Sequence, residues 1–321
     1  MAVKITQPAR NLREELNELR TPTGIAGEAM LRADTPQEQF NLIGAGRKNL
    51  IINGGFDVWQ RGTSFVNQAG QVYNADRFLN GSSTPVYTTT KGTATVDGKS
   101  VNTHRTDVTS SATVWLDSCY QVIEDYKLLD GQYVTMSAWV RTDIPNINFR
   151  QWSTANHSDV FPADGQWHYV TTTFKANCSA GAVKNLNGST FGIVMSGSSA
   201  LSSGQFLEVA MFQLELGKVA TPFEHRSYGE ELALCQRYYL ITQTYRSGYI
   251  VQATGGVEST PFPVNMRTAP TLNIITNDAF INCTGVAVFD DDNQGFRHHP
   301  SGGTSNIATR YRVRISADAE L

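Results

Sequence analysis

The chain has 321 residues, 40% of them hydrophobic and 17% charged, so it is long enough for two or three globular domains with real cores. The net charge of -3 gives no reason to expect a nucleic-acid-binding surface. The sequence contains no run of 18 apolar residues, so no transmembrane helix is predicted. The N-terminus lacks the apolar core of a signal peptide, so we expect folding in a cytoplasm.

The four cysteines lie far apart in the sequence. No pair has the CxxC spacing of a zinc or redox motif. They are therefore interpreted as reduced thiols, most of them buried.

Residues 1–47 are predicted to form a short helical segment. An apolar 4-3-4-3 spacing, typical of a coiled-coil seam, is made by Ile5, Ala9, Leu12, Leu16 and Leu19. Since Pro8 can only begin such a helix, the helix covers about residues 9–20, and an isolated helix of about 12 residues is marginal in water. It needs a partner: copies of itself, a site on another protein, or its own chain.

Residues 48–228 are predicted to be rich in short β-strands. An apolar run, residues 50–52, is followed by the turn sequence Asn53-Gly54-Gly55 and by a second short strand at residues 56–58. About ten further strand patterns follow without long helices between them, which indicates a β-sandwich or a jelly roll.

One strand pattern, residues 133–140, alternates strictly. Its small apolar face carries Val134, Met136, Ala138 and Val140. The opposite face carries Tyr133, Thr135, Ser137 and Trp139, because alternate side chains of a strand point to opposite faces. We expect Tyr133 and Trp139 on this face to line a concave sheet that faces solvent.

Residues 229–321 are predicted to form a short helix that leads into a smaller β-domain. The last strand pattern alternates Tyr311, Val313 and Ile315 with three arginines, which is typical of an outer or interface strand. The adjacent residues His298 and His299 are not expected to bind a metal ion, because neighbouring side chains of a strand point apart and could not share one ion. The pair is interpreted as an exposed loop.

Several motifs resemble those of phage tail fibres and related virion appendage proteins. They are LIINGGFDVWQRG at residues 50–62 with Asp76-Arg77-Phe78, LDGQYVTMSAWV at 129–140, GQWH at 165–168, FQLELGKVATPFE at 212–224 and ELALCQRYY at 231–239. The module also resembles the galactose-binding-like family of carbohydrate-binding modules. The resemblance covers about residues 35–321.

The resemblance implies a mainly β protein. A short α-helical N-terminal segment (1–47) would serve anchoring and trimerisation. A jelly-roll β-sandwich (48–228) and a smaller C-terminal β-domain (229–321) follow it. It also implies a homotrimer, assembled in the infected bacterial cytoplasm and attached to other virion proteins through residues 1–47. Three helices could bury together the seam of Ile5, Leu12, Leu16 and Leu19.

The expected role is that of a structural tail-fibre protein that binds host surface glycans. The alternative is a trimeric head fibre or capsid decoration protein. We expect no enzyme, because no GxSxG, HExxH or Cys/His arrangement is present. A glycan-degrading depolymerase with paired carboxylates from distant positions is the third reading.

Carbohydrate sites normally combine exposed aromatic rings with amide and carboxylate groups. The candidates are Trp115, Trp139, Trp152, Trp167, Tyr120 and Tyr133. Trp152 lies in a polar stretch and is the strongest single candidate for an exposed ring. The alternative is that these rings belong to the core or to a trimer interface.

The resemblance further implies a structural calcium ion near the first strand, with Asp57 and Glu208 as oxygen ligands. The alternative is that both are ordinary surface carboxylates. No other cofactor is expected.

Overall fold

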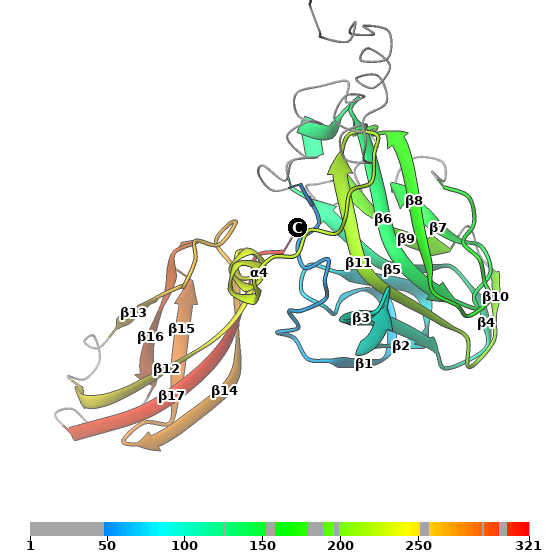
Figure 1. Ribbon diagram of the computed structural model, residues 1–321. Coiled ribbons are helices and arrows are strands. Elements are labelled where there is room, and N and C mark those ends of the chain that lie inside the picture. Colours follow the sequence, from blue (N-terminus) through cyan, green and yellow to red (C-terminus); the bar gives the residue numbers. More distant parts are fainter. Residues whose placement is uncertain are drawn as a thin grey trace, which may run out of the picture.

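The computed structural model describes residues 48–124, 126–151, 158–178, 189–195, 199–250, 257–290, 292–301 and 307–320. The predicted seam of Ile5, Leu12, Leu16 and Leu19 and the candidate Trp152 lie outside these residues. The described part of the chain holds two β-structures side by side, joined through helix α4 (Tyr228–Gln236) (Figure 1). The prediction of a mainly β fold is confirmed. Among the described helices, none is long and apolar enough to cross a membrane.

The first β-structure contains eleven strands in the described residues. They are β1 (Ser64–Tyr73), β2 (Leu79–Val96), β3 (Lys99–Val108), β4 (Ala112–Val114), β5 (Leu116–Ile123), β6 (Tyr133–Thr142), β7 (Ile147–Gln151), β8 (His168–Lys175), β9 (Ser189–Met195), β10 (Ser199–Leu201) and β11 (Phe206–Leu216), with a 3-10 helix at Tyr126–Leu129. All their pairings are antiparallel, in the order β7-β9-β5-β2-β3-β11-β6-β8, while β1 also pairs with β2 and β4 pairs with β10.

The long strand β2 takes part in both layers of the sandwich. Its first residues, Leu79 to Ser82, pair with β5, whereas Tyr87 to Val96 pair with β3. The layer β7-β9-β5 therefore lies against the layer β3-β11-β6-β8, as in a jelly roll.

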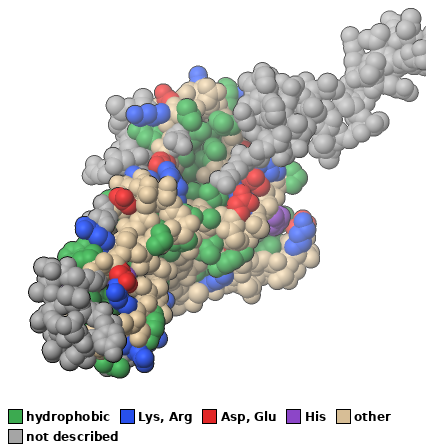
Figure 2. All heavy atoms as spheres, turned by 90° about the vertical axis from the view of Figure 1, so that its left-hand side faces the viewer, with side chains coloured by type: hydrophobic (Ala, Val, Ile, Leu, Met, Phe, Trp, Pro, Cys, Tyr) green, Lys and Arg blue, Asp and Glu red, His purple; other side chains and the backbone are tan. Residues whose placement is uncertain are grey.

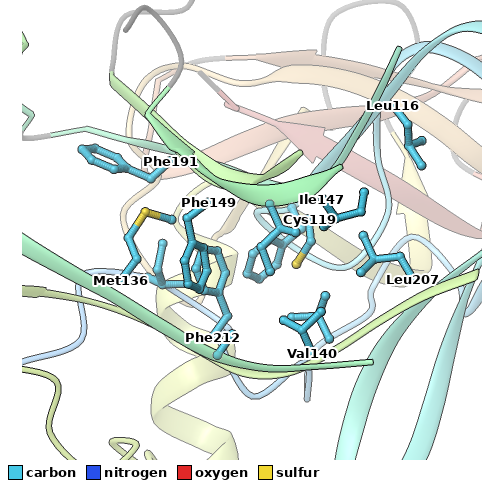
Figure 3. Close-up of a cluster of buried hydrophobic side chains, with 14 of the residues drawn as sticks. Leu116, Cys119, Met136, Val140, Ile147, Phe149, Phe191, Leu207 and Phe212 are labelled. Atoms are coloured by element: carbon cyan, nitrogen blue, oxygen red, sulfur yellow. The ribbon is translucent and has the colours of Figure 1, made fainter. Parts of the chain in front are cut away.

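The core fills the space between these layers. Figure 3 shows side chains of β5, β7 and β9 meeting those of β6 and β11, among them Phe149 and Phe212, whose rings stack with centroids 6.0 Å apart. The alternation predicted for residues 133–140 is confirmed on its apolar face, where Val134, Met136 and Ala138 are fully buried. Of the four cysteines, three are buried and all are free thiols, as predicted.

In the part of the chain that the structure describes, the second β-structure contains six strands in two small sheets. The first sheet has the order β12-β17-β14, with β12 at Tyr239–Ile250, β17 at Ile307–Asp318 and β14 at Thr271–Ile281. The second has the order β13-β16-β15, with β13 at Glu258–Pro261, β16 at Gly295–Ser301 and β15 at Gly285–Asp290. A separate core between them includes Phe296, Tyr311 and Val313.

The loop prediction for His298-His299 is wrong, because both residues belong to β16. The His298 ring is buried, with Nδ1 2.9 Å from the Tyr311 hydroxyl and Nε2 3.0 Å from Thr260 Oγ1. Two hydrogen-bond partners from other strands let this polar ring occupy the core, and local sequence carries no sign of them.

Residues 49–62 form a buried loop, so the two short strands predicted there are wrong. The turn at Asn53 is present, with a positive φ of 61°. Its side chain replaces strand pairing: Asn53 Nδ2 donates to the carbonyl oxygens of Val58 (2.8 Å) and Asp76 (3.0 Å), and Val58 N donates back to Asn53 Oδ1 (2.9 Å). The loop also has backbone hydrogen bonds with β11, from Leu50 N to Leu214 O (2.8 Å) and from Phe212 N to Gly54 O (2.9 Å). The Asn53 amide thus satisfies the part of the segment that lies beyond these two bonds.

This loop also contacts the second β-structure. Asn53 N donates to the Glu231 carboxylate of α4, and Gln60 Nε2 donates to Tyr239 O (2.7 Å). Nearby, the buried Arg77 pairs with Glu320, and its guanidinium carbon lies 3.6 Å from the centre of the Tyr238 ring. The two β-structures are therefore joined by hydrogen bonds and ion pairs between buried groups.

Candidate functional site

The outer face of the layer β3-β11-β6-β8 carries the candidate site. On β6 this is the predicted face of Tyr133, Thr135, Ser137 and Trp139, of which Tyr133 and Trp139 reach solvent while Thr135 and Ser137 are buried. Trp139 lies opposite Tyr169 of β8, and their ring centroids are 5.6 Å apart at an interplanar angle of 49°. Tyr169 is 46% exposed and Trp139 is half-buried, so two adjoining aromatic rings are accessible from solvent.

A bulge in β11 adds an apolar side chain to this face. The register with β6 shifts between Ala210 and Gln213, and Met211 within the bulge has a positive φ of 52°. Because one extra residue is inserted, Ala210 and Met211 both belong to an outer apolar cluster, in which Trp139, Trp167 and Phe223 pack against them, while Phe212 returns to the core. Sequence alternation alone would have placed Met211 inside.

Residues 220–225 form a wall across this face. Buried Glu215 accepts from Thr221 N (3.0 Å), and Lys48 Nζ donates to Thr221 Oγ1 (2.8 Å). Glu224 N donates to Gln213 Oε1 (2.8 Å). Burial raises the pKa of the Glu215 carboxyl, although the hydrogen bonds from Thr221 act in the opposite direction.

The bulge, the wall and the aromatic pair enclose a groove of about 610 Å³. Its apolar lining comes from Trp139, Tyr169, Met211, Ala220, Pro222 and Phe223. Its polar lining comes from Asp97, Lys99, Ser137, Thr221 and His225. The arrangement offers flat apolar ring faces together with charged, hydroxyl and imidazole groups that form hydrogen bonds.

The other sequence candidates for sugar contact have separate positions. Tyr133 lies further along the same face of β6, is 46% exposed and has the Lys218 ammonium 4.6 Å from its ring centre. Trp115 is half-buried and packs on Gly81, where a Cβ atom would come within 2.9 Å of the indole ring. Trp167 joins the outer apolar cluster, and Tyr120 is buried. Of the aromatic candidates from the sequence that the structure describes, only Trp139 lines the groove.

Sequence reasoning missed Tyr169, Met211, Phe223 and His225 as groove residues. Tyr169 had a usable signal, since it directly follows the GQWH motif in a strand pattern. The other three reach the groove through the bulge and the wall, which depend on contacts between distant residues.

The proposed calcium ligands Asp57 and Glu208 have other partners. Glu208 is 3% exposed, and its carboxylate pairs with Arg105 (3.2 Å) and Arg141 and accepts from Thr103 Oγ1 (2.7 Å). Asp57 Oδ1 accepts from Asn102 Nδ2 (2.6 Å).

Two guanidinium groups on one carboxylate repel a cation, so this donor set does not fit calcium. Among the described residues, no cluster of three or more His, Cys, Asp or Glu side chains is placed to hold a metal ion. The calcium site stays a prediction that these contacts do not support.

Comparison with known proteins gives distant likenesses only. No family model matches the chain, and no curated protein matches it. Three solved structures illustrate the similarities. Tailspike protein 4 of bacteriophage CBA120, described as an enzymatically active domain, has 16% identity over 48% of this chain and 21% of its own, with a TM-score of 0.30.

The xylan-binding domain CBM22-1 of Paenibacillus barcinonensis Xyn10C has 10% identity over 55% of this chain and all of its own, with a TM-score of 0.32. The tripod from the baseplate of bacteriophage Tuc2009 has 19% identity over 52% of this chain and 66% of its own, with a TM-score of 0.27.

The chain thus spans about a fifth of the tailspike structure and just under two thirds of the tripod. These solved structures belong to the two classes of protein that the sequence motifs resemble, phage tail proteins and carbohydrate-binding modules. At such TM-scores they carry no argument of their own.

Proposed function

We propose that this protein is a trimeric phage tail-fibre protein that binds glycans of the host surface in the groove beside Trp139. The groove itself carries the proposal, since it places two accessible aromatic rings next to carboxylate, ammonium, hydroxyl and imidazole groups. The motifs of residues 50–62 and 212–224 support the virion context. The protein would be assembled in the host cytoplasm and attached to other virion proteins through residues 1–47.

The chemistry follows from the two kinds of lining. The apolar faces of sugar rings stack on Trp139 and Tyr169, while sugar hydroxyls exchange hydrogen bonds with Ser137, Asp97 and His225. A single open groove of this kind binds weakly. Three subunits per fibre, in several copies per particle, raise the overall affinity through effective concentration.

Binding of purified protein to host cells and to host surface polysaccharide tests this proposal. Trp139→Ala removes one stacking face, which contributes about 0.5–1.5 kcal/mol beyond its buried area, so single-site affinity should fall roughly two- to tenfold. Tyr228→Ala is the matched control, because Tyr228 is 60% exposed, belongs to α4 and does not line the groove. Equal binding by both variants and the unchanged protein would exclude the groove.

The attachment role of residues 1–47 has its own test. A chain of residues 48–321 should stay folded, sediment as a monomer and no longer join particles. Incorporation of this truncated chain would overturn the anchoring role, and a trimeric truncated chain would overturn trimerisation through the seam.

Two other roles give different results in simple experiments. A head fibre or capsid decoration protein would be labelled by antibody on the capsid surface instead of the tail, and saturating protein would not block infection. We propose no enzymatic activity. Incubation with host polysaccharide should release no oligosaccharide, and release would indicate a depolymerase.

A further inference from the structure

The outer face of the sheet β12-β17-β14 carries a row of arginines. Strand β17 is central in this sheet, and its inward residues, among them Tyr311, Val313 and Ile315, are fully buried. The alternate residues Arg310, Arg312 and Arg314 are exposed. On a strand, alternate residues are about 6.8 Å apart, so three guanidinium groups follow one line across the middle of the sheet.

Few carboxylates oppose this row. Arg312 pairs with Asp278 of β14 (2.7 Å), and both side chains are about two-fifths exposed, at 44% and 37%. Within the described residues, Arg310 and Arg314 form no ion pair. Asp318 lies at the far end of the same row, where it is 3.7 Å from Arg61. The row therefore keeps an excess of positive charge.

The flanking strands add groups that suit a hydroxyl-rich ligand. Tyr245 of β12 lies opposite Arg312 and is 56% exposed. Gln243 and Thr276 lie on either side of Arg314. An accessible aromatic ring, an amide and a hydroxyl thus surround the unpaired guanidinium groups.

We propose that this face binds a carboxylate-bearing, acidic polysaccharide at a site separate from the groove. Guanidinium groups bind carboxylates through two parallel hydrogen bonds, and the row offers Arg310 and Arg314 for this contact. The Tyr245 ring offers a stacking face for a sugar. The site lies on a different domain from Trp139, so it does not depend on the groove.

Two other occupants fit less well. A symmetric contact with a second copy of the chain through this face would bring arginine rows together, at an electrostatic cost. Figure 2, which views the molecule from the side of the second β-structure, shows hydrophobic side chains in small groups scattered among polar ones. Nucleic acid is disfavoured by the net charge of -3.

The experiment measures binding of the full-length protein to polygalacturonate, with dextran as the neutral polymer. We expect binding to polygalacturonate only, and weaker binding as salt rises, because surface charges are screened. Arg310→Gln with Arg314→Gln should lower the affinity by roughly tenfold or more. The matched control, Lys127→Gln with Arg297→Gln, removes the same charge from exposed positions elsewhere and should leave the affinity unchanged.

A gain of binding provides a second readout. Asp278→Asn removes a negative charge that faces Arg312, so it should raise the affinity for polygalacturonate. Damage to the fold would lower this affinity instead. Trp139→Ala should leave this binding unchanged, which separates the two sites.

The proposal is overturned if the arginine variant binds like its control. It is also overturned if double-stranded DNA of equal charge binds as tightly as polygalacturonate, or if dextran binds equally well.

Discussion

Replacement of Glu320 by glutamine tests the joint between the two β-structures. The Arg77 guanidinium is 1% exposed and has three partners: the Glu320 carboxylate, the Val122 carbonyl oxygen (2.7 Å) and the Tyr238 ring. Glu320 also lies 3.3 Å from Arg61. Glu320→Gln keeps the size of the side chain and removes the charge that both guanidinium groups face.

The expected cost follows from burial. Breaking a buried ion pair costs about 3–5 kcal/mol, because one charge is left without compensation. Glutamine still offers an oxygen acceptor, and Arg77 keeps its other two partners, so we expect a loss of about 2–3 kcal/mol. The control is Asp278→Asn at the exposed pair with Arg312, where a loss of about 0–1 kcal/mol is expected.

Urea unfolding followed by two probes gives the measurement. All five tryptophans precede residue 168, so tryptophan fluorescence reports the jelly roll, while circular dichroism reports both β-structures. In the unchanged protein the two transitions should coincide, and in Glu320→Gln they should separate. A variant no less stable than Asp278→Asn, with transitions that still coincide, would refute the importance of this ion pair.

Three further predictions concern buried groups of the jelly roll. Burial raises the pKa of the Asp76 carboxyl from 3.8 to about 6, with opposing effects from Arg61 and Gln60, so its contribution to stability should fall as pH rises from about 4 to about 6. Asp76→Asn should remove this part of the pH dependence of the free energy of unfolding. If that free energy changes with pH in the variant as it does in the unchanged protein, the Asp76 carboxyl is not its source. Gly54→Ala places a Cβ atom against the Phe212 carbonyl oxygen and should lower the free energy of unfolding by about 1–3 kcal/mol. Gly229→Ala, whose Cβ atom would enter open space, should leave the free energy of unfolding unchanged. Because two arginines already hold Glu208, the melting temperature should be the same in calcium and in a chelator, and a rise with calcium would restore the metal site.

The parts of the fold that could be predicted are those that depend on local pattern. The alternation of residues 133–140 identified the core face of β6 and the accessible rings of Tyr133 and Trp139, since a half-buried strand repeats every two residues. It gave no sign that Thr135 and Ser137 between these rings are buried. The same reasoning placed the arginines of β17 opposite its buried residues, and α4 was expected where residues 229–239 show a helical pattern.

The remainder depends on contacts between residues far apart in sequence. The loop at residues 49–62 was predicted as strands because its apolar residues suit them, yet the Asn53 side chain and the Asp76 carbonyl hold it as a loop. Similarly, the sequence near Glu208 does not predict its partners Arg105 and Arg141, which come from neighbouring strands. Trp139 was identified, whereas the wall that makes its surface a groove was not.

The pairing of Arg77 with Glu320 also bears on the order of folding during synthesis. The two residues are separated by 243 positions, so the Arg77 side chain is made long before its partner. Domains generally fold as units, with the N-terminal one first, and the jelly roll can therefore form while this guanidinium still lacks its carboxylate. The contacts of Asn53 with Glu231 and of Gln60 with Tyr239 involve residues that are made earlier, so the Arg77–Glu320 ion pair is the last part of the joint to form. Nascent chains stopped before β17 should then carry a folded jelly roll whose joint still lacks this ion pair.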